Sequence, residues 1–130
     1  MMAKKHNKTY LFFLGLSAIL YVAGGINHFL ATKSYASIVP PWFPAHIFLI
    51  YLSGVAEIVL GISLLFRHTR KLAGILIVLM LIAYLPLHIY MLQIAPFMLG
   101  TVMVTKLIAW VRLPIQAVLI FWAAVYIKNP

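Results

Sequence analysis

The chain contains no cysteine and only one acidic residue among its 130 residues. Without cysteine it can form no disulfide bond, no thiolate metal site and no thiol nucleophile of its own. Any thiol or sulfur redox chemistry must therefore take place on a partner. Charged residues of all kinds make up 8% of the sequence, against about 25% in soluble domains, so the composition excludes an ordinary soluble domain.

Hydrophobic residues are abundant instead. They make up 65% of the chain, whereas soluble domains are about 45–50% apolar, so the composition indicates a membrane protein with several spans. The formal net charge of +9 suggests nucleic acid at first, but cations in so hydrophobic a chain more often orient membrane spans. We expect no nucleic-acid partner, and a single domain over residues 1–130.

Four apolar stretches have nearly the length of about 20 residues that a helix needs to cross a bilayer. They cover approximately residues 10–31, 46–66, 72–92 and 106–127. The predicted fold class is all-α, a polytopic membrane protein built as a bundle of four transmembrane helices. A cleaved signal peptide is the alternative for the first stretch, but the apolar run continues past the usual length of a signal's core.

Basic residues are distributed unevenly between the two ends of these spans. One side carries Lys4, Lys5, Lys8, Arg67, Arg70, Lys71 and Lys128, and the other carries Lys33, Lys106 and the partly buried Arg112. The positive-inside rule therefore predicts that both termini and the turn over residues 67–71 lie in the cytoplasm. The lipid bilayer is then the surrounding partner.

The single acidic residue, Glu57, lies inside the apolar run 47–66. A lone charge in hydrocarbon costs roughly 2.5–3.5 kcal/mol, so the carboxylate needs a partner or a neutralising proton. Ser53, Gly54 and Gly61 lie about one turn away on either side. Because stripes of small residues mark close contacts between membrane helices, this pattern predicts that Glu57 faces the interior of the bundle.

The alternating direction of the spans predicts one layer of polar residues in the outer half of the bundle. Its expected members are Asn27, His28, Glu57, Tyr84, His88, Arg112 and Gln116. Since Arg112 is the only cation expected within the membrane, an ion pair between Glu57 and Arg112 is the least costly arrangement of the two charges. Three interpretations stay open: a functional pair, a pair that only locks the bundle, and an unpaired, protonated Glu57.

Two histidines of this layer, His28 and His88, come from different helices at similar depth. Such an arrangement would suit axial ligation of a b-type haem. Two histidines alone are weak support, and histidine has many other roles, so haem b is disfavoured. No spacing resembles a dedicated metal site, a nucleophile–base arrangement or a phosphate loop, so we expect no metal ligands and find no self-sufficient catalytic motif.

Five groups of residues occur in order along nearly the whole chain. They are Gly25-Ile26-Asn27-His28-Phe29; Ile38-Val39-Pro40 with Trp42 and Pro44; Ser53-Gly54-Val55-Ala56-Glu57 with Gly61; Thr69-Arg70-Lys71-Leu72-Ala73; and Arg112-Leu113-Pro114-Ile115-Gln116 followed by Trp122-Ala123. As a set they resemble the DoxX and DoxX-like family of small four-helix membrane proteins. The resemblance implies a multi-pass plasma-membrane protein, in some members a subunit of a quinone-linked oxidoreductase such as thiosulfate:quinone oxidoreductase. In others it implies an association with quinone or oxidative stress, and distant eukaryotic relatives act as chaperones or cargo receptors.

The leading hypothesis is an outer-half pocket that binds a quinone, menaquinone or ubiquinone, or a similar amphipathic small molecule. Histidine and a protonated carboxyl group can donate hydrogen bonds to quinone carbonyls and exchange protons with the reduced form. Glu57 and Arg112 are the candidate catalytic residues, the first as the proton-active group and the second as the holder of its charge or of a ligand oxygen. The candidate ligand-binding residues are Asn27, His28, Tyr84, His88 and Gln116.

The alternative hypothesis is a non-catalytic scaffold or assembly partner for a redox enzyme or a client protein. In that case the polar layer only specifies how the helices pack. Whether the chain is an enzyme subunit therefore stays open, and its partner is either a redox-enzyme subunit or a further copy of the chain. A transporter is the least favoured class, because the cytoplasmic halves of the spans offer almost no polar residues.

Overall fold

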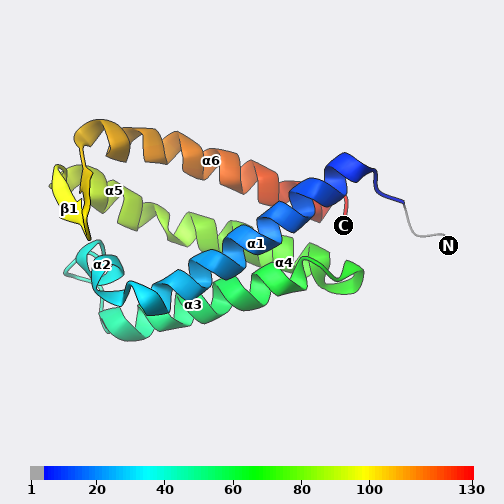
Figure 1. The fold of residues 1–130 in the computed structure, drawn as a ribbon, viewed down its shortest axis with the longest axis horizontal. Coiled ribbons are helices and arrows are strands. Elements are labelled where there is room, and N and C mark those ends of the chain that lie inside the picture. Colours follow the sequence, from blue (N-terminus) through cyan, green and yellow to red (C-terminus); the bar gives the residue numbers. More distant parts are fainter. Residues whose placement is uncertain (1–4) are drawn as a thin grey trace.

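The structure is a computed structural model that describes residues 5–130, arranged as an elongated bundle of antiparallel helices (Figure 1). In chain order the elements are α1 (Lys8–Leu30), α2 (Thr32–Ser37), α3 (His46–Ser63), α4 (Arg67–Ala83), α5 (Leu85–Ile94), β1 (Phe97–Leu99), β2 (Val102–Val104) and α6 (Lys106–Lys128). The two strands form an antiparallel hairpin in which Met98 pairs with Met103. The predicted bundle of four long helical segments is confirmed, whereas α2 and the hairpin were not predicted.

Four helical segments are long and apolar enough to cross a membrane. They are Lys8–Leu30, His46–Ser63, Arg67–Ile94, which combines α4 and α5, and Lys106–Lys128. Large apolar side chains on their outer faces are exposed: Phe12 is 65% exposed, Leu79 57% and Phe121 74%. Soluble monomers rarely expose contiguous apolar surface on this scale, so the outside of the bundle has the character of a lipid-facing surface.

The start of α1 and the C-terminus lie at the end of the bundle that also carries the turn between α3 and α4 (Figure 1). The Tyr10 hydroxyl donates a hydrogen bond of 2.5 Å to the Asn129 carbonyl, which ties the start of α1 to the end of α6. The basic residues predicted for one side therefore gather at one end of the fold, except Lys4, which lies outside the described residues. Lys33 in α2 lies at the opposite end.

Glycines allow α1 and α3 to approach very closely. A Cβ atom added at Gly25 would lie 2.5 Å from the Gly54 carbonyl oxygen, and one added at Gly54 would lie 2.9 Å from the Gly25 carbonyl oxygen. A Cβ at Gly61 would lie 3.0 Å from the Ala18 carbonyl oxygen. The small-residue stripe on α3 is thus the contact surface for α1, as predicted, and Glu57 on the same helix is 9% exposed and faces the interior.

The third predicted span, residues 72–92, is broken between α4 and α5. Pro86 is the second residue of α5, and a proline has no N–H to donate and clashes with the carbonyl one turn earlier. The break leaves carbonyl groups at the end of α4 that need partners. The Leu81 carbonyl accepts a hydrogen bond of 2.6 Å from Gln116 Nε2 of α6, and Gln116 is fully buried.

Arg70 closes the turn between α3 and α4. Its Nε donates to the Leu64 carbonyl at 2.7 Å and its Nη2 to the Leu65 carbonyl at 3.2 Å, and the residue is 5% exposed. These carbonyls end α3, where a cation is favoured by the helix dipole. Arg70 therefore has a structural role in addition to its contribution to the basic end of the molecule.

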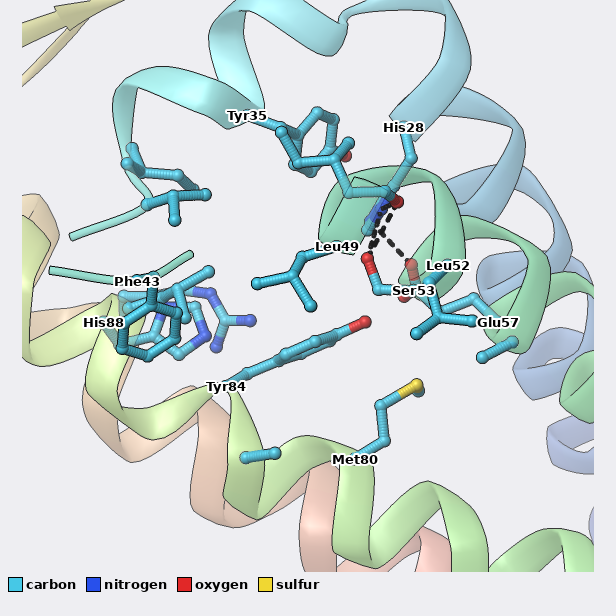
Figure 2. Close-up of a pocket in the computed structure, with 17 residues that line it drawn as sticks. His28, Tyr35, Phe43, Leu49, Leu52, Ser53, Glu57, Met80, Tyr84 and His88 are labelled. Carbon is cyan, nitrogen blue, oxygen red and sulfur yellow. Dashed lines mark hydrogen bonds and ion pairs between the residues drawn. The ribbon is translucent and has the colours of Figure 1, made fainter. Parts of the chain in front are cut away.

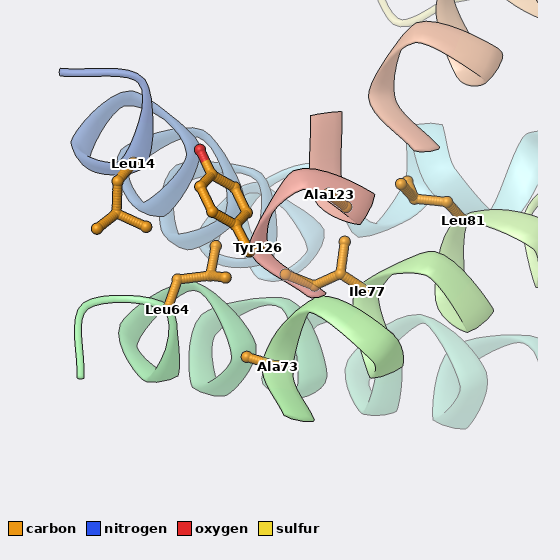
Figure 3. Packing of buried hydrophobic residues seen from close by; sticks show 7 residues of the cluster. All are labelled: Leu14, Leu64, Ala73, Ile77, Leu81, Ala123 and Tyr126. Atoms are coloured by element: carbon orange, nitrogen blue, oxygen red, sulfur yellow. The ribbon is translucent and has the colours of Figure 1, made fainter. Parts of the chain in front are cut away.

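Two apolar clusters fill the interior at different heights. Around the end that carries the termini, one cluster packs side chains from α1, α4 and α6 together with Leu64, which ends α3 (Figure 3). Its buried members are Leu14, Leu64, Ala73, Ile77, Leu81, Ala123 and Tyr126. A second cluster under the hairpin consists of Ile38, Met91, Ala95, Val104 and Ala109.

Replacement of Gly25 by alanine tests the close approach of α1 and α3. We expect Gly25→Ala to lower the free energy of unfolding by about 1–3 kcal/mol, because the added methyl group meets backbone atoms that cannot rotate away. Gly15→Ala is the matched control on the same helix, since nothing lies within 4 Å of a Cβ there. It should be neutral or stabilising by up to about 1 kcal/mol, because alanine has the higher helix propensity. Thermal unfolding of both variants in detergent is the measurement, and equal effects would contradict the close contact.

Candidate functional site

A cavity of about 480 Å³ lies between α3 and the broken pair α4 and α5. It is within the size range of about 300–1,000 Å³ that is usual for small-molecule sites. Most of its wall is apolar, and the polar side chains come from five elements of the fold. The lining residues are His28, Tyr35, Ile38, Val39, Phe43, Leu49, Ile50, Leu52, Ser53, Ala56, Glu57, Met80, Ala83, Tyr84, Leu87, His88 and Arg112.

On one side of the cavity His28 of α1 contacts three groups of α3 (Figure 2). Its Nε2 lies 2.7 Å from Glu57 Oε2 in an ion pair. Its Nδ1 lies 3.0 Å from the Ile50 carbonyl oxygen and 3.0 Å from Ser53 Oγ. His28 is 7% exposed and Glu57 9%, so the pair is almost completely shielded from the surroundings of the bundle.

These contacts fix where the protons of the pair lie. The Ile50 carbonyl can only accept, and the Ser53 hydroxyl already donates to that same carbonyl at 2.9 Å, so Nδ1 of His28 must carry a proton and donate. Nε2 and the carboxylate then share one further proton across 2.7 Å. Whether this proton resides on the imidazole or on the carboxyl group, the pair has no net charge, which lowers the cost of burying it.

On another side of the cavity, two nitrogen-bearing side chains have unsatisfied atoms. Neither ring nitrogen of His88 has a hydrogen-bond partner, although the residue is only 9% exposed, and Nη1 of Arg112 is likewise buried without a partner. The two residues are close enough to interact electrostatically. Figure 2 shows Tyr84 and Leu49 between His88 and the group formed by His28, Ser53 and Glu57.

Several buried polar groups away from the cavity find partners within the protein, although Oε1 of Gln116 does not. Ser17 Oγ and Tyr126 OH lie 3.1 Å apart, Trp122 Nε1 donates to Tyr126 OH at 2.8 Å, and Arg70 donates to the end of α3. Most buried polar groups in proteins are satisfied in this way, and exceptions call for an explanation. Among the described residues 5–130, the unsatisfied nitrogens of His88 and Arg112 both belong to the lining of the cavity. This concentration marks that part of the wall as a site for polar groups of a ligand.

Five of the seven residues predicted as a polar layer line this one cavity, namely His28, Glu57, Tyr84, His88 and Arg112. The other two lie elsewhere. Asn27 is exposed, and its Nδ2 donates to the Tyr35 hydroxyl at 2.9 Å beside a smaller cavity. Gln116 donates a hydrogen bond from its amide nitrogen to the Leu81 carbonyl. This bond joins α6 to the end of α4 at the α4–α5 break.

The predicted ion pair between Glu57 and Arg112 is wrong. Glu57 is paired with His28, and no ion pair of Arg112 forms within the described residues 5–130. The prediction failed because it matched formal charges and treated histidine as neutral support. The glycine contact brings His28 against α3, since a Cβ at Gly54 would lie 2.9 Å from His28 Cβ, and the imidazole reaches the carboxylate first.

Two further residues of the cavity were not identified as site residues from the sequence. Ser53 holds His28 in place, and a signal was available, because it precedes Glu57 by four residues and therefore shares its face of α3. The ring of Tyr35 in α2 lies 4.2 Å from that of His28 and separates the main cavity from the smaller one beside Asn27. No pattern in the sequence predicts this contact.

The donor set of the cavity does not suit a haem held by His28 and His88. Axial ligation needs a free lone pair on one nitrogen of each imidazole. In His28 one nitrogen donates to the Ile50 carbonyl and the other is in the ion pair with Glu57, so ligation by His28 would break the pair that neutralises the buried carboxylate. The geometry therefore agrees with the sequence in disfavouring haem b.

Comparison with known protein families assigns the chain to one family. Residues 16–127 match the family described as Domain of unknown function (DUF8561), and the chain belongs to that family. No curated protein and no solved structure gives a significant match. The chemistry of the cavity is thus the principal guide to function.

A double-mutant cycle tests the shared proton of His28 and Glu57. We expect Glu57→Leu and His28→Leu each to destabilise the bundle by about 3–5 kcal/mol, because each leaves the other polar group buried without its partner. The double variant should recover most of this loss, since it leaves neither member of the pair buried without the other. Glu57→Gln should be mild by comparison, because the amide can donate to Nε2 of His28. Thermal unfolding in detergent measures all four, and additive losses in the double variant would argue against a coupled pair.

Proposed function

We propose that the chain is a multi-pass plasma-membrane protein that binds a quinone or a similar amphipathic small molecule as part of a membrane oxidoreductase system. The observation that carries the proposal is the cavity itself, an apolar chamber with unsatisfied polar nitrogens from His88 and Arg112 on its wall. The sequence motifs also resemble those of the DoxX family, some of whose members are linked to quinones, and this resemblance supports quinone as the ligand.

The membrane location is supported by the four apolar helical segments and the exposed apolar side chains on them. The orientation, with both termini cytoplasmic, is supported by the collection of basic residues at one end of the bundle. In this orientation the cavity opens in the half of the bundle that lies toward the outer leaflet.

The absence of cysteine from the chain makes a direct test of orientation practical, because one introduced thiol gives one labelling site. Ser37→Cys places it at the exposed end of α2, and His68→Cys places it at the exposed start of α4, at the opposite end of the bundle. We expect a membrane-impermeant maleimide to label the first variant in intact cells and the second only after permeabilisation. The reverse pattern would overturn the orientation.

The composition of the cavity wall supports an amphipathic occupant. Aliphatic side chains such as Leu49, Ile50 and Leu87 would contact an apolar ring or chain, while His88 and Arg112 would donate hydrogen bonds to its oxygens. A buried donor without a partner costs about 1–3 kcal/mol, so a ligand oxygen that satisfies these nitrogens gains that free energy on binding.

The pair of His28 and Glu57 would serve a ligand that gains and loses protons. Reduction of a quinone to the quinol takes up two electrons and two protons, and in this proposal the electrons come from a partner redox enzyme. The pair holds one proton between two good acceptors, and the Tyr84 hydroxyl points toward it from across the cavity (Figure 2). A shared proton in reach of the ligand is the chemistry of a general acid or base.

Extraction and ligand addition test the binding proposal. We expect lipid extracts of the purified protein, analysed by mass spectrometry, to contain quinone in a stoichiometric amount. We also expect an added short-chain menaquinone or ubiquinone analogue at about 100 times its Kd to stabilise the protein by about 2.7 kcal/mol.

Ala56→Leu provides a variant with a filled cavity, and Val55→Leu is its control, because Ala56 lines the cavity and Val55 faces outward with 50% exposure. The first should lose the stabilisation by the ligand and the second should keep it. A wild-type protein that carries no amphipathic molecule and is not stabilised by any would favour the scaffold alternative.

A further inference from the structure

The guanidinium of Arg112 has no counterion in the chain. Glu57 is the only acidic residue, and its carboxylate is engaged by His28. Nη1 of Arg112 is buried without a hydrogen-bond partner, and the residue lines the cavity. A half-buried cation loses part of its hydration, so an accompanying opposite charge stabilises it, and no other side chain of this protein can supply that charge.

The charges around the cavity sum to one positive charge. His28 and Glu57 together are neutral wherever their shared proton resides, and a neutral His88 adds a donor and an acceptor but no charge. Arg112 alone remains uncompensated. A ligand with one negative charge would therefore make the occupied cavity neutral.

His88 gives a second, independent indication of the same ligand group. It is 9% exposed, neither ring nitrogen has a partner, and it lies near Arg112. One N–H of the imidazole and the fork of the guanidinium form a set of donors suited to an oxygen anion. The apolar remainder of the wall would contact an uncharged body.

We propose that the end of the cavity formed by Arg112 and His88 binds the ionised acidic group of an amphiphile whose apolar body fills the rest of the chamber. This inference rests on the proposed binding of an amphipathic small molecule and adds the charge of its head group. Two kinds of molecule share this chemistry: a quinone that carries an ionised hydroxyl group on its ring, and a fatty acid with its carboxylate. Neutral quinones then bind more weakly than either.

Matched probes that differ only in charge test the proposal. One pair is a hydroxynaphthoquinone with an undecyl side chain, ionised at neutral pH, and its methyl ether. The other pair is dodecanoate and its methyl ester. For the wild-type protein in uncharged detergent, we expect each acid to bind at least about tenfold more tightly than its neutral partner, as is usual for a hydrogen bond to a charged group. The comparison of the two acids shows whether the quinone or the fatty acid is the better occupant.

Arg112→Gln should abolish this preference by weakening the acids and leaving the neutral probes unchanged. Lys106→Gln is the matched control, because it removes an exposed cation from the same helix at a position outside the cavity lining, and it should keep the preference. Arg112→Lys retains the charge and should keep a reduced preference, which covers the case in which Arg112→Gln does not fold.

Three outcomes would overturn the inference. Equal binding of acid and neutral probe by the wild-type protein would do so, as would loss of preference in Lys106→Gln. Equal weakening of both probes by Arg112→Gln would also do so. In each case binding of the neutral quinone still supports the proposed function, whereas a protein that binds none of the four probes contradicts both proposals.

Discussion

The proton shared between His28 and Glu57 determines the electrostatics of the whole interior. The chain has one carboxylate to place inside an apolar bundle, and the choice of its partner decides which other charge stays unbalanced. Pairing with Arg112 would have given two ions of opposite charge. Pairing with His28 gives a group that is neutral in either proton position, and leaves Arg112 as the cation that faces the cavity.

The close approach of the α1 and α3 backbones brings His28 and Glu57 together. Gly25 and Gly54 let α1 and α3 touch at a distance that no side chain would allow. At this distance the imidazole of His28 reaches the Ile50 carbonyl, which fixes its orientation and the proton on Nδ1. The remaining nitrogen can then only face Glu57. A change in the glycine contact would therefore alter the chemistry of the site, although neither glycine lines the cavity.

Much of the fold follows from the sequence because long apolar runs and glycine spacing are local signals. The four long apolar helical segments, the inward direction of Glu57 and the contact surface on α3 were all predicted from them. The break between α4 and α5 depends on Pro86, whose effect on backbone hydrogen bonds is also local. The role of Gln116 at that break was not predicted, because its partner Leu81 lies 35 residues away in sequence.

The site was predictable to a lesser extent, for a different reason. The direction of each span gives the depth of a residue, and depth placed five of seven residues correctly around one cavity. Depth does not give the angle around the helix axis, so Asn27 and Gln116 were assigned to a site that their side chains do not reach. Two side chains can pair only if both their depth and their angle around the helix axis match. The sequence gives only the depth, so the partner of Glu57 could be identified only in the structure.

Most buried polar side chains of this bundle have partners, and the exceptions lie mainly on the wall of the cavity. Tyr126, Arg70 and the amide nitrogen of Gln116 are buried polar groups with partners, and each joins two elements of the fold. His88 and Arg112 carry nitrogens with no such partner and therefore lower the stability of the unliganded protein. A scaffold would gain nothing from this cost, because apolar residues at the same positions would pack equally well. In a binding protein, the ligand restores the lost stability whenever it pairs with these nitrogens. This difference is the physical reason to prefer ligand binding over a purely structural role for the cavity.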